Sequence, residues 1–349
     1  MARRLGALAV AVLMIAGAVV LRNHIDDDSG SSGGASDGGS ETVALTCATE
    51  LAVVCNALVE ADPSVRATVE PAGVTADKLE ATSGAIEGMD GWLVEAPWPD
   101  IVDGARQSSG TPSAFATTSD VLARSPLVMA MWNDRLAALL PNCANGALTW
   151  KCVSEVAGEK WSSIGGESAW QTVKPGFADP IDDGVGALVL AQAASSFLGT
   201  TNLSRSDFET DEFQNWITQL AGAVPQNPTF EDMLAIGQSA VDVVGTTEAE
   251  AGPALASSRD KDKITITYPA PMATADVVLA SVDGASGGER LARIVSGDAG
   301  RRALAGAGWR VPDEPAVEGV DTSVSLPSAS GLPSPGVIDA LRDLWKGAR

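Results

Sequence analysis

Histidine is almost absent from this chain of 349 residues: the only one is His24. It lies within residues 22–41, a stretch of Gly, Ser and Asp with almost nothing apolar, which predicts a flexible, solvated tether. A lone histidine in a tether removes histidine-based acid–base or triad chemistry from the folded part. The sequence also has no phosphate-binding loop and no dinucleotide fingerprint. We therefore expect no enzyme and no cofactor.

Positive charge is scarce as well. The chain has 23 Lys and Arg against 45 Asp and Glu, a formal net charge of -22. Nucleic acids and anionic lipid surfaces would repel such a protein. We expect neither as a partner of the folded part.

Cysteine is limited to two local pairs, Cys47 with Cys55 and Cys143 with Cys152. Neither spacing is that of a zinc site, so we expect no metal there. In an oxidising compartment the pairs predict two disulfides, and the short loops favour local pairing among the three connectivities. Four buried free thiols are the alternative.

A single long apolar run, residues 5–21, follows Arg3 and Arg4 near the N-terminus. Its 17 residues would span about 25 Å as a helix, the short limit for a bilayer. Residues 16–18 offer a signal-peptidase site, but the run continues beyond them. We favour an uncleaved membrane anchor over a cleaved signal, and either places the protein outside the cytoplasm. No cysteine follows closely enough for lipid modification.

The first part of the folded region alternates strands and helices. Strands are expected at residues 42–46, 65–71 and 91–98, the last running into a loop. This alternation is typical of a parallel sheet with helices on its faces. A further buried strand is expected at 125–132, followed by mostly helical sequence.

Later segments are more varied. Residues 246–262 are polar and are expected to be mobile. Strands are expected at 264–271 and 276–282, and two short helices follow. The last segment, rich in Pro, Ser and Gly, ends in a short amphipathic helix with Ile338, Leu341, Leu344 and Trp345 on one face.

Residues 174–194 combine a Pro/Gly loop, two adjacent carboxylates and an apolar helix. Asp182 and Asp183 are good N-cap residues for a helix that begins near Gly184. The free N–H groups of a helix N-terminus can also bind a small ligand.

Five segments follow one another along the chain: ARSPLVMAMW, LTWKCVSEVA, KPGFADPIDDGVGALVL, ITITYPAP and DAGRRALAGAGWRVP. In this order they resemble the type II periplasmic, or extracellular, solute-binding proteins that serve ABC importers. The resemblance covers about residues 42–312. In particular, the chain is similar to the solute-binding part of actinobacterial proteins in which this region precedes a von Willebrand factor A domain.

The resemblance implies an α/β fold of two lobes joined by two crossover strands, with a ligand enclosed between them by a hinge motion. The expected parts are residues 1–21 as signal or anchor, 22–41 as tether, 42–127 plus 268–315 as lobe 1, 128–267 as lobe 2, and 316–349 as tail.

Four loops should line the cleft, because open α/β sheets bind ligands beyond the carboxyl ends of their strands. The residues expected to bind ligand are Thr49, Glu50, Glu95, Trp98, Ser163, Asp182 and Asp183. Trp98 is expected either to stack on the ligand or to be simply half-buried.

The chemistry of these loops departs from that of family members that bind oxyanions or sugars, which place Ser or Thr with Gly there. Two carboxylates beside a cleft repel an anion by about a few kcal/mol at reduced dielectric. A cationic, amine-bearing or polyol solute is easier to accommodate than molybdate, sulfate or phosphate, and a divalent metal is the weakest option.

We therefore expect an anchored solute-binding protein that passes a small ligand to an ABC permease or a sensor. The alternative is an anchored interaction protein of the same fold that binds a surface partner through its C-terminal helix.

Overall fold

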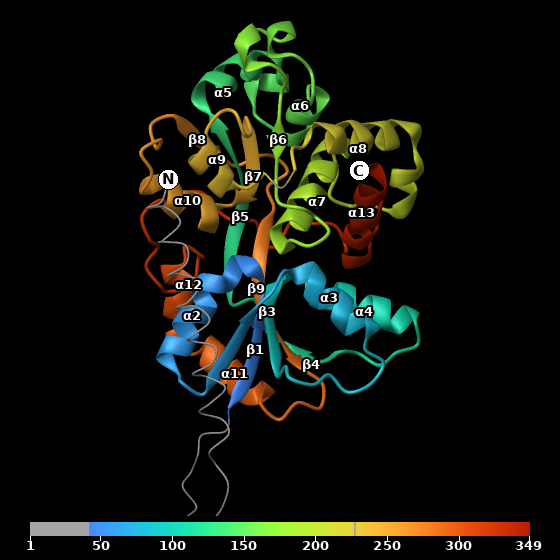
Figure 1. The fold of residues 1–349 in the computed structure, drawn as a ribbon, viewed down its shortest axis with the longest axis vertical. Coiled ribbons are helices and arrows are strands. Elements are labelled where there is room, and N and C mark those ends of the chain that lie inside the picture. The colour runs from blue at the N-terminus through green and yellow to red at the C-terminus, as the bar shows by residue number, and fades with distance from the viewer. Residues whose placement is uncertain (1–41, 227) are drawn as a thin grey trace, which may run out of the picture. The chain divides into compact units, whose positions relative to one another are not determined.

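The computed structural model describes residues 42–226 and 228–349 (Figure 1). The expected anchor and tether, residues 1–41, lie outside the described residues. None of the described helices combines the length and hydrophobicity that crossing a bilayer requires.

Nine strands of the described chain form one sheet in the order β2-β1-β3-β9-β5-β7-β6, with β4 on β9 and β8 on β5. The pairs β1–β2, β1–β3 and β6–β7 are parallel, whereas β9 and β5 are antiparallel to their partners. The parallel arrangement expected for the first three strands is confirmed. The centre of the sheet is antiparallel, because β9 returns late in the chain and inserts between β3 and β5. The strands are β1 (Val43–Cys47), β2 (Val65–Val69), β3 (Gly91–Ala96), β4 (Phe115–Thr118), β5 (Ala123–Trp132), β6 (Pro175–Gly176), β7 (Val243–Thr247), β8 (Ile264–Thr267) and β9 (Thr274–Val282).

Strand β5 divides the sheet into two halves. Its first residues, 123–126, pair with β9, and residues 127–131 pair with β7. We call the part built on β1, β2, β3, β4 and β9 the β1 half, and the part built on β6, β7 and β8 the β7 half. The chain returns from β8 to β9 through residues 268–273.

Helices cover the sheet of both halves (Figure 1). Those of the β1 half are α2 (Ala52–Ala61), α3 (Ala72–Ala81), α4 (Trp98–Ser108), α11 (Gly288–Ser296) and α12 (Asp298–Gly306). Those of the β7 half are α5 (Asn133–Leu139), α6 (Trp150–Glu155), α7 (Gly184–Leu198), α8 (Asp211–Ala223), α9 (Phe230–Ile236) and α10 (Glu248–Ala256).

Helix α7 is deeply buried: every residue from Gly184 to Ser196 is buried, and most of them are apolar. It begins where expected: the Asp183 side chain caps it by accepting a hydrogen bond of 2.6 Å from the Gly186 N–H. Gly199 ends it in the left-handed conformation, with φ 71°.

Two expectations about local structure are wrong. Residues 246–262 are not a mobile stretch, because Thr247 caps α10, whose residues Ala249, Ala251 and Leu255 are buried. Residues 97–98 do not continue as a loop, because α4 begins at Trp98 directly after β3. The start of α10 lies in a polar stretch and the start of α4 follows Pro97, so neither start was recognised from the sequence.

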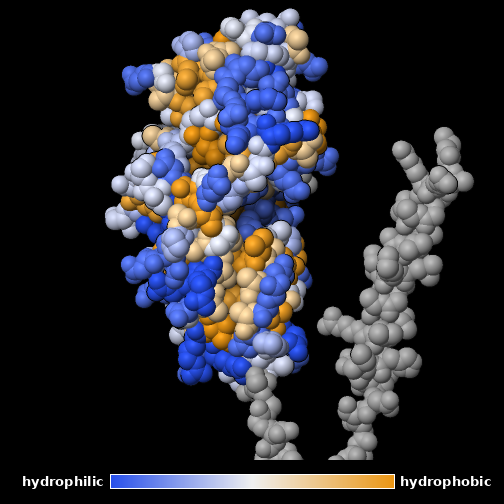
Figure 2. Space-filling model, turned by 90° about the vertical axis from the view of Figure 1, so that its left-hand side faces the viewer, coloured by the Kyte–Doolittle hydropathy of each residue, from blue (hydrophilic) through white to orange (hydrophobic). Residues whose placement is uncertain are grey.

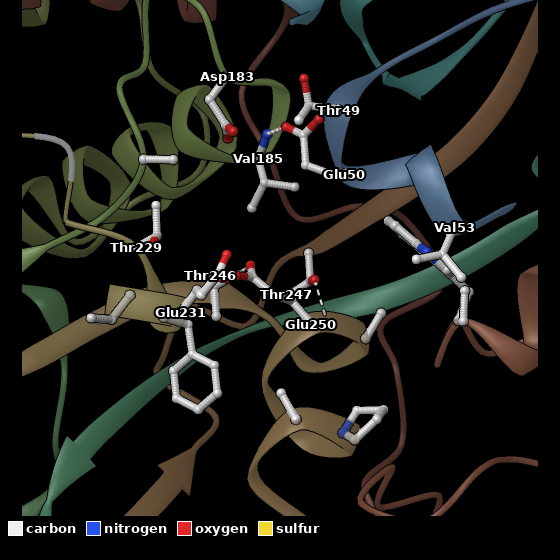
Figure 3. A pocket seen from close by; sticks show the side chains of 18 of the residues that line it. Thr49, Glu50, Val53, Asp183, Val185, Thr229, Glu231, Thr246, Thr247 and Glu250 are labelled. Atoms are coloured by element: carbon white, nitrogen blue, oxygen red, sulfur yellow. Dashed lines mark hydrogen bonds between the residues drawn. The ribbon is translucent and has the colours of Figure 1, made fainter. Parts of the chain in front are cut away.

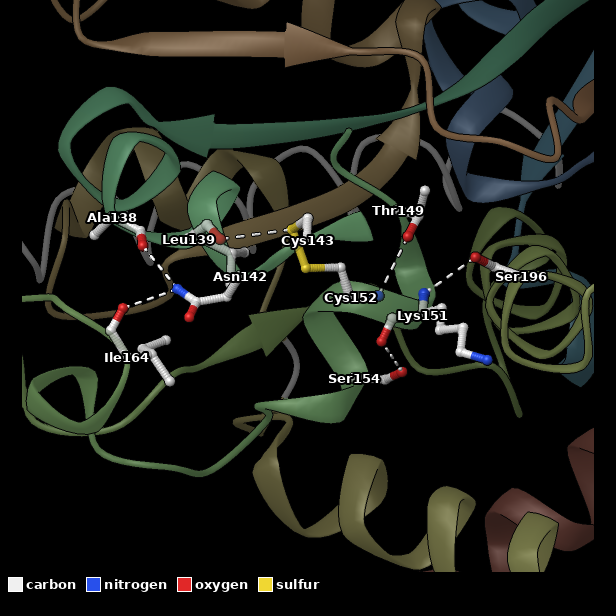
Figure 4. Close-up of a disulfide and its surroundings, with 10 residues drawn as sticks. All are labelled: Ala138, Leu139, Asn142, Cys143, Thr149, Lys151, Cys152, Ser154, Ile164 and Ser196. Atoms are coloured by element: carbon white, nitrogen blue, oxygen red, sulfur yellow. Dashed lines mark hydrogen bonds between the residues drawn. A yellow bond between two sulfur atoms is a disulfide. The ribbon is translucent and has the colours of Figure 1, made fainter. Parts of the chain in front are cut away.

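Both disulfides join local pairs. Cys47–Cys55 links the end of β1 to α2, so it closes a ring around the 3-10 turn η1 (Thr49–Leu51). Cys143–Cys152 links the segment after α5 to α6 (Figure 4). The Lys151 N–H next to the second disulfide donates to Ser196 Oγ of α7, which fixes α6 on α7.

The C-terminal helix α13 (Pro335–Ala348) packs on the rest of the chain and contacts both halves, through α4 on one side and α7 and α8 on the other. Trp345 is fully buried, with its ring 5.2 Å from that of Phe177. The Arg342 guanidinium lies 4.3 Å from the Trp98 ring and donates to the Pro180 and Ile181 carbonyls.

Candidate ligand-binding site

A cavity of about 600 Å³ lies between the two halves, within the range of small-molecule sites. The β1 half contributes η1, the start of α2 and the end of α12. The β7 half contributes the start of α7, residues 229–231, and β7 with α10. Its principal lining residues are Thr49, Glu50, Val53, Asp183, Val185, Thr229, Glu231, Thr246, Thr247, Glu250 and Trp309 (Figure 3).

The face of α2, α10 and α12 that surrounds the cavity carries hydrophobic patches among strongly hydrophilic ones (Figure 2). Val53 of α2 is 65% exposed although it is apolar. Large apolar residues on the surface are ordinary when single, but this one lines the cavity.

Glu50 connects the halves at the top of the cavity. Its Oε1 atom accepts a hydrogen bond of 2.9 Å from the Val185 N–H, in the first turn of α7. The positive end of the helix dipole therefore faces a carboxylate of the other half. The second oxygen, Oε2, is buried and has no hydrogen-bond partner among the described residues.

Asp183 stands beside Glu50 (Figure 3). Burial raises the pKa of Asp183 well above its ordinary value, and the nearby carboxylate of Glu50 raises it further. Two ionised carboxylates side by side repel each other in a partly dehydrated site.

Glu250 faces them from α10. Its carboxylate accepts a hydrogen bond from Thr246 Oγ1, and its N–H donates to Thr247 Oγ1 over 3.2 Å. Removal of water raises the pKa of Glu250, the Thr246 hydrogen bond lowers it, and Glu50 and Glu231 raise it.

Glu95 lies immediately behind this group, at the end of β3. It is 0% exposed, and neither carboxyl oxygen has a hydrogen-bond partner among the described residues. Glu95 Oε2 and Glu50 Oε1 both lie within 3.0 Å of the position that a Cβ on Gly184 would occupy. Burial, and secondarily the charge of Glu50, raise the pKa of Glu95 well above its ordinary value.

Thr49, Glu50 and Asp183 of the expected residues line the cavity together. Three others lie elsewhere. Asp182 is exposed and uses its backbone carbonyl to accept from the Gly73 N–H. Trp98 is fully buried and donates its indole N–H to the Gly184 carbonyl, so it is neither a stacking platform nor half-buried. Ser163 donates to the Lys160 carbonyl in a surface turn.

Sequence reasoning missed the wall formed by Thr246, Thr247 and Glu250. The signal available was Thr247 followed by Glu250, the spacing of a capping box at a helix start after a buried strand. Trp309 appeared in the sequence only as part of the segment DAGRRALAGAGWRVP, yet it lines the cavity from just beyond α12.

No lysine or arginine is among the described residues that line the cavity. Across residues 42–226 and 228–349, no group of three or more His, Cys, Asp or Glu side chains is placed to hold a metal ion. The site therefore offers carboxylates and hydroxyls above an apolar wall, a surface suited to binding.

No protein-family model and no curated protein matches the sequence. Solved structures do match the fold at low sequence identity, so they establish the fold alone. The fructose-6-phosphate-bound periplasmic binding protein AfuA from Actinobacillus pleuropneumoniae is 12% identical, with a TM-score of 0.56, and 88% of this chain covers 98% of it. A periplasmic thiamin binding protein is 14% identical, with a TM-score of 0.56, 91% of this chain and 99% of that one being covered.

An apo ferric ion-binding protein A from Pasteurella haemolytica is 11% identical, with a TM-score of 0.54 and coverages of 88% and 96%. These neighbours are binding proteins with two lobes, and the cavity of the present chain lies between its two halves. The chain thus has the two-lobe type II periplasmic solute-binding fold.

Proposed function

We propose that the protein captures a small solute in the cavity between its halves and presents it to an ABC importer or a sensor. The observation that carries the proposal is the cavity itself, which draws its walls from both halves of a solute-binding fold. A solute that contacts Glu50 on one side and Glu250 on the other would hold the two halves together.

In this proposal the protein functions outside the cytoplasm, in keeping with its two disulfides. We extend the proposal to anchoring through residues 5–21 and to the expected lobe boundaries, 42–127 plus 268–315 and 128–267. Likeness to the actinobacterial proteins with a von Willebrand factor A domain also remains a proposal.

Thermal-shift screening of the full-length protein with sugars, amines, amino acids and metal ions tests the function. At 100 times its dissociation constant, a bound solute stabilises the folded state by about 2.7 kcal/mol, which is readily measured. Absence of a shift with every class would overturn the proposal.

A blocking variant sharpens the test. Val53 is exposed at the cavity wall, so Val53→Trp fills space without disturbing the core. Val121→Trp is the matched control, because Val121 is 45% exposed and lies outside the cavity lining. Only Val53→Trp should abolish the ligand-induced shift.

The alternative of a partner-binding protein rested on the apolar face of the C-terminal helix. That face is covered within the chain, where Ile338, Leu341 and Trp345 are buried against α4, α7 and α8. No feature of the described residues favours this alternative.

A further inference from the structure

The N-terminus of α7 would be the natural place for an anionic group in the cavity, because its N–H groups and dipole favour negative charge. Two of those N–H groups are already engaged by carboxylates of the chain. Val185 donates to Glu50 over 2.9 Å, and Gly186 donates to Asp183 over 2.6 Å. The protein thus supplies its own anion where an anionic solute would dock.

The remaining charge of the cavity is also negative. Glu231 and Glu250 extend the acidic lining from α9 and α10, and the described lining residues include no lysine or arginine. Arg310, close in sequence to the lining residue Trp309, is paired with Glu248 over 2.7 Å. An anion entering the cavity would therefore meet repulsion without a compensating partner.

Glu95 adds an independent observation. A fully buried carboxyl whose two oxygens have no partner among the described residues is costly to keep, because burial normally requires a hydrogen bond or a counter-charge. It lies against Glu50, whose Oε2 atom is likewise unpartnered. The unpartnered carboxyl oxygens of Glu50 and Glu95 therefore lie close together beside the cavity, where a bound positive charge would compensate them.

The size and walls of the cavity distinguish between positive ligands. A bare metal ion needs several oxygens within about 2.6 Å and no apolar wall. Here the volume is about 600 Å³, and Val53, Val185, Phe230, Pro253 and Trp309 form much of the lining. Such a space fits an organic body that carries the charge.

We propose that the cavity selects an organic cation, a solute with a protonated amine or a quaternary nitrogen, whose charge is neutralised by Glu50, Asp183 and Glu250. The proposal rests on the solute-binding function proposed above. The apolar wall receives the uncharged part of the solute, while Thr246 and Thr247 border the charged end.

Calorimetric titration of the full-length protein tests the class of solute. The cationic probes are choline, putrescine, spermidine and thiamin, the neutral probe is glucose, and the anionic probes are sulfate and fructose-6-phosphate. We expect binding by at least one cation and by none of the others. Binding of glucose or an anion without any cation overturns the cation proposal but leaves solute binding intact, whereas absence of binding by all probes overturns both.

Variants then test the residues. Glu50→Gln, Asp183→Asn and Glu250→Gln keep the shape, and Asn keeps the helix cap, so folding should be preserved. Each should raise the dissociation constant of the bound cation by about tenfold or more, as for a lost charged hydrogen bond. Glu155→Gln is the control, because Glu155 is exposed on α6 outside the cavity lining.

The carboxylate variants must bind the cation more weakly than the Glu155→Gln control does. Equal affinity of Glu50→Gln, Glu250→Gln and the Glu155→Gln control for the cation would overturn the assigned role of the carboxylates. Circular dichroism shows whether a variant has unfolded. In that case the cation affinities of the other two carboxylate variants test the proposal.

Discussion

The Glu50 side chain and the Val185 N–H join the two halves of the fold through one hydrogen bond of 2.9 Å. Glu50 belongs to the turn after β1, and Val185 to the first turn of α7. A single carboxylate therefore both joins the two halves and contributes to the cavity wall. Changes around this contact should affect stability and binding together.

Stability of the ligand-free protein should increase as the pH is lowered from 7 toward about 5. Burial raises the pKa values of Glu95, Asp183 and Glu250, so in this window the folded state binds more protons than the unfolded state. The free energy of unfolding therefore falls as the pH rises from the ordinary carboxyl pKa values through the raised pKa values of the three groups. Urea unfolding at each pH measures the effect.

The triple variant Glu95→Gln, Asp183→Asn, Glu250→Gln is the internal test of that prediction. It should flatten the rise in stability, because the folded state then lacks three carboxyls whose pKa values burial raises. The carboxyls that face these groups are Glu50 and Glu231. Asp62, Asp207, Asp260 and Asp321 have lowered pKa values and act only below about pH 4. An unchanged pH profile would contradict the assignment.

Removal of the Cys47–Cys55 disulfide by a double Ser substitution should lower the free energy of unfolding by about 2–3 kcal/mol, as expected for a short loop. It should also weaken solute binding, because the ring encloses the turn that carries Thr49 and Glu50. The double Ser variant of Cys143 and Cys152 is the matched control. It should lose similar stability, and the affinity of its remaining folded fraction should be unchanged.

Gly73→Ala should destabilise the protein, because a Cβ there would lie 2.0 Å from the Ile181 carbonyl oxygen of the other half. We expect a cost of about 1–3 kcal/mol, typical of overpacking. Gly104→Ala in the middle of α4 meets nothing within 4 Å and should instead stabilise by about 0.5–1 kcal/mol. Opposite signs in chemical denaturation would support the close contact of the halves.

Trp345→Ala in α13 should cost about 3–5 kcal/mol, because the ring is fully buried against Phe177. Lys346→Ala, one residue later and exposed, should change stability by less than about 0.5 kcal/mol. Similar small effects from both variants would mean that α13 is not docked in solution.

The sequence predicted the α/β class and most strands because their apolar runs are strong local signals. It also located the start of α7, since Asp183 is a local cap. It did not show where β9 inserts, because the antiparallel pairing of β9 with β3 and β5 depends on contacts between segments far apart in the chain.

The binding site shows the same division. Adjacent Asp182 and Asp183 were indistinguishable in sequence, yet their backbone conformations place only one carboxylate at the cavity. Trp98 lost its expected role because α4 begins at that residue and buries it. Glu250 could not be assigned to the site without knowing that α10 faces η1 across the cavity.

Helix α13 links the two halves of the fold on one flank of the cavity, which bears on how the halves could separate. The helix ties α4 to α7 and α8 on one flank, whereas the cavity is bordered on the other by α2, α10 and α12 (Figure 1). Because α13 holds the halves together on its own flank, the halves should separate more easily on the opposite flank. We expect solute to enter and leave on the flank formed by α2, α10 and α12, where the ion pair between Arg310 and Glu248 of α10 is a contact that opening would have to break.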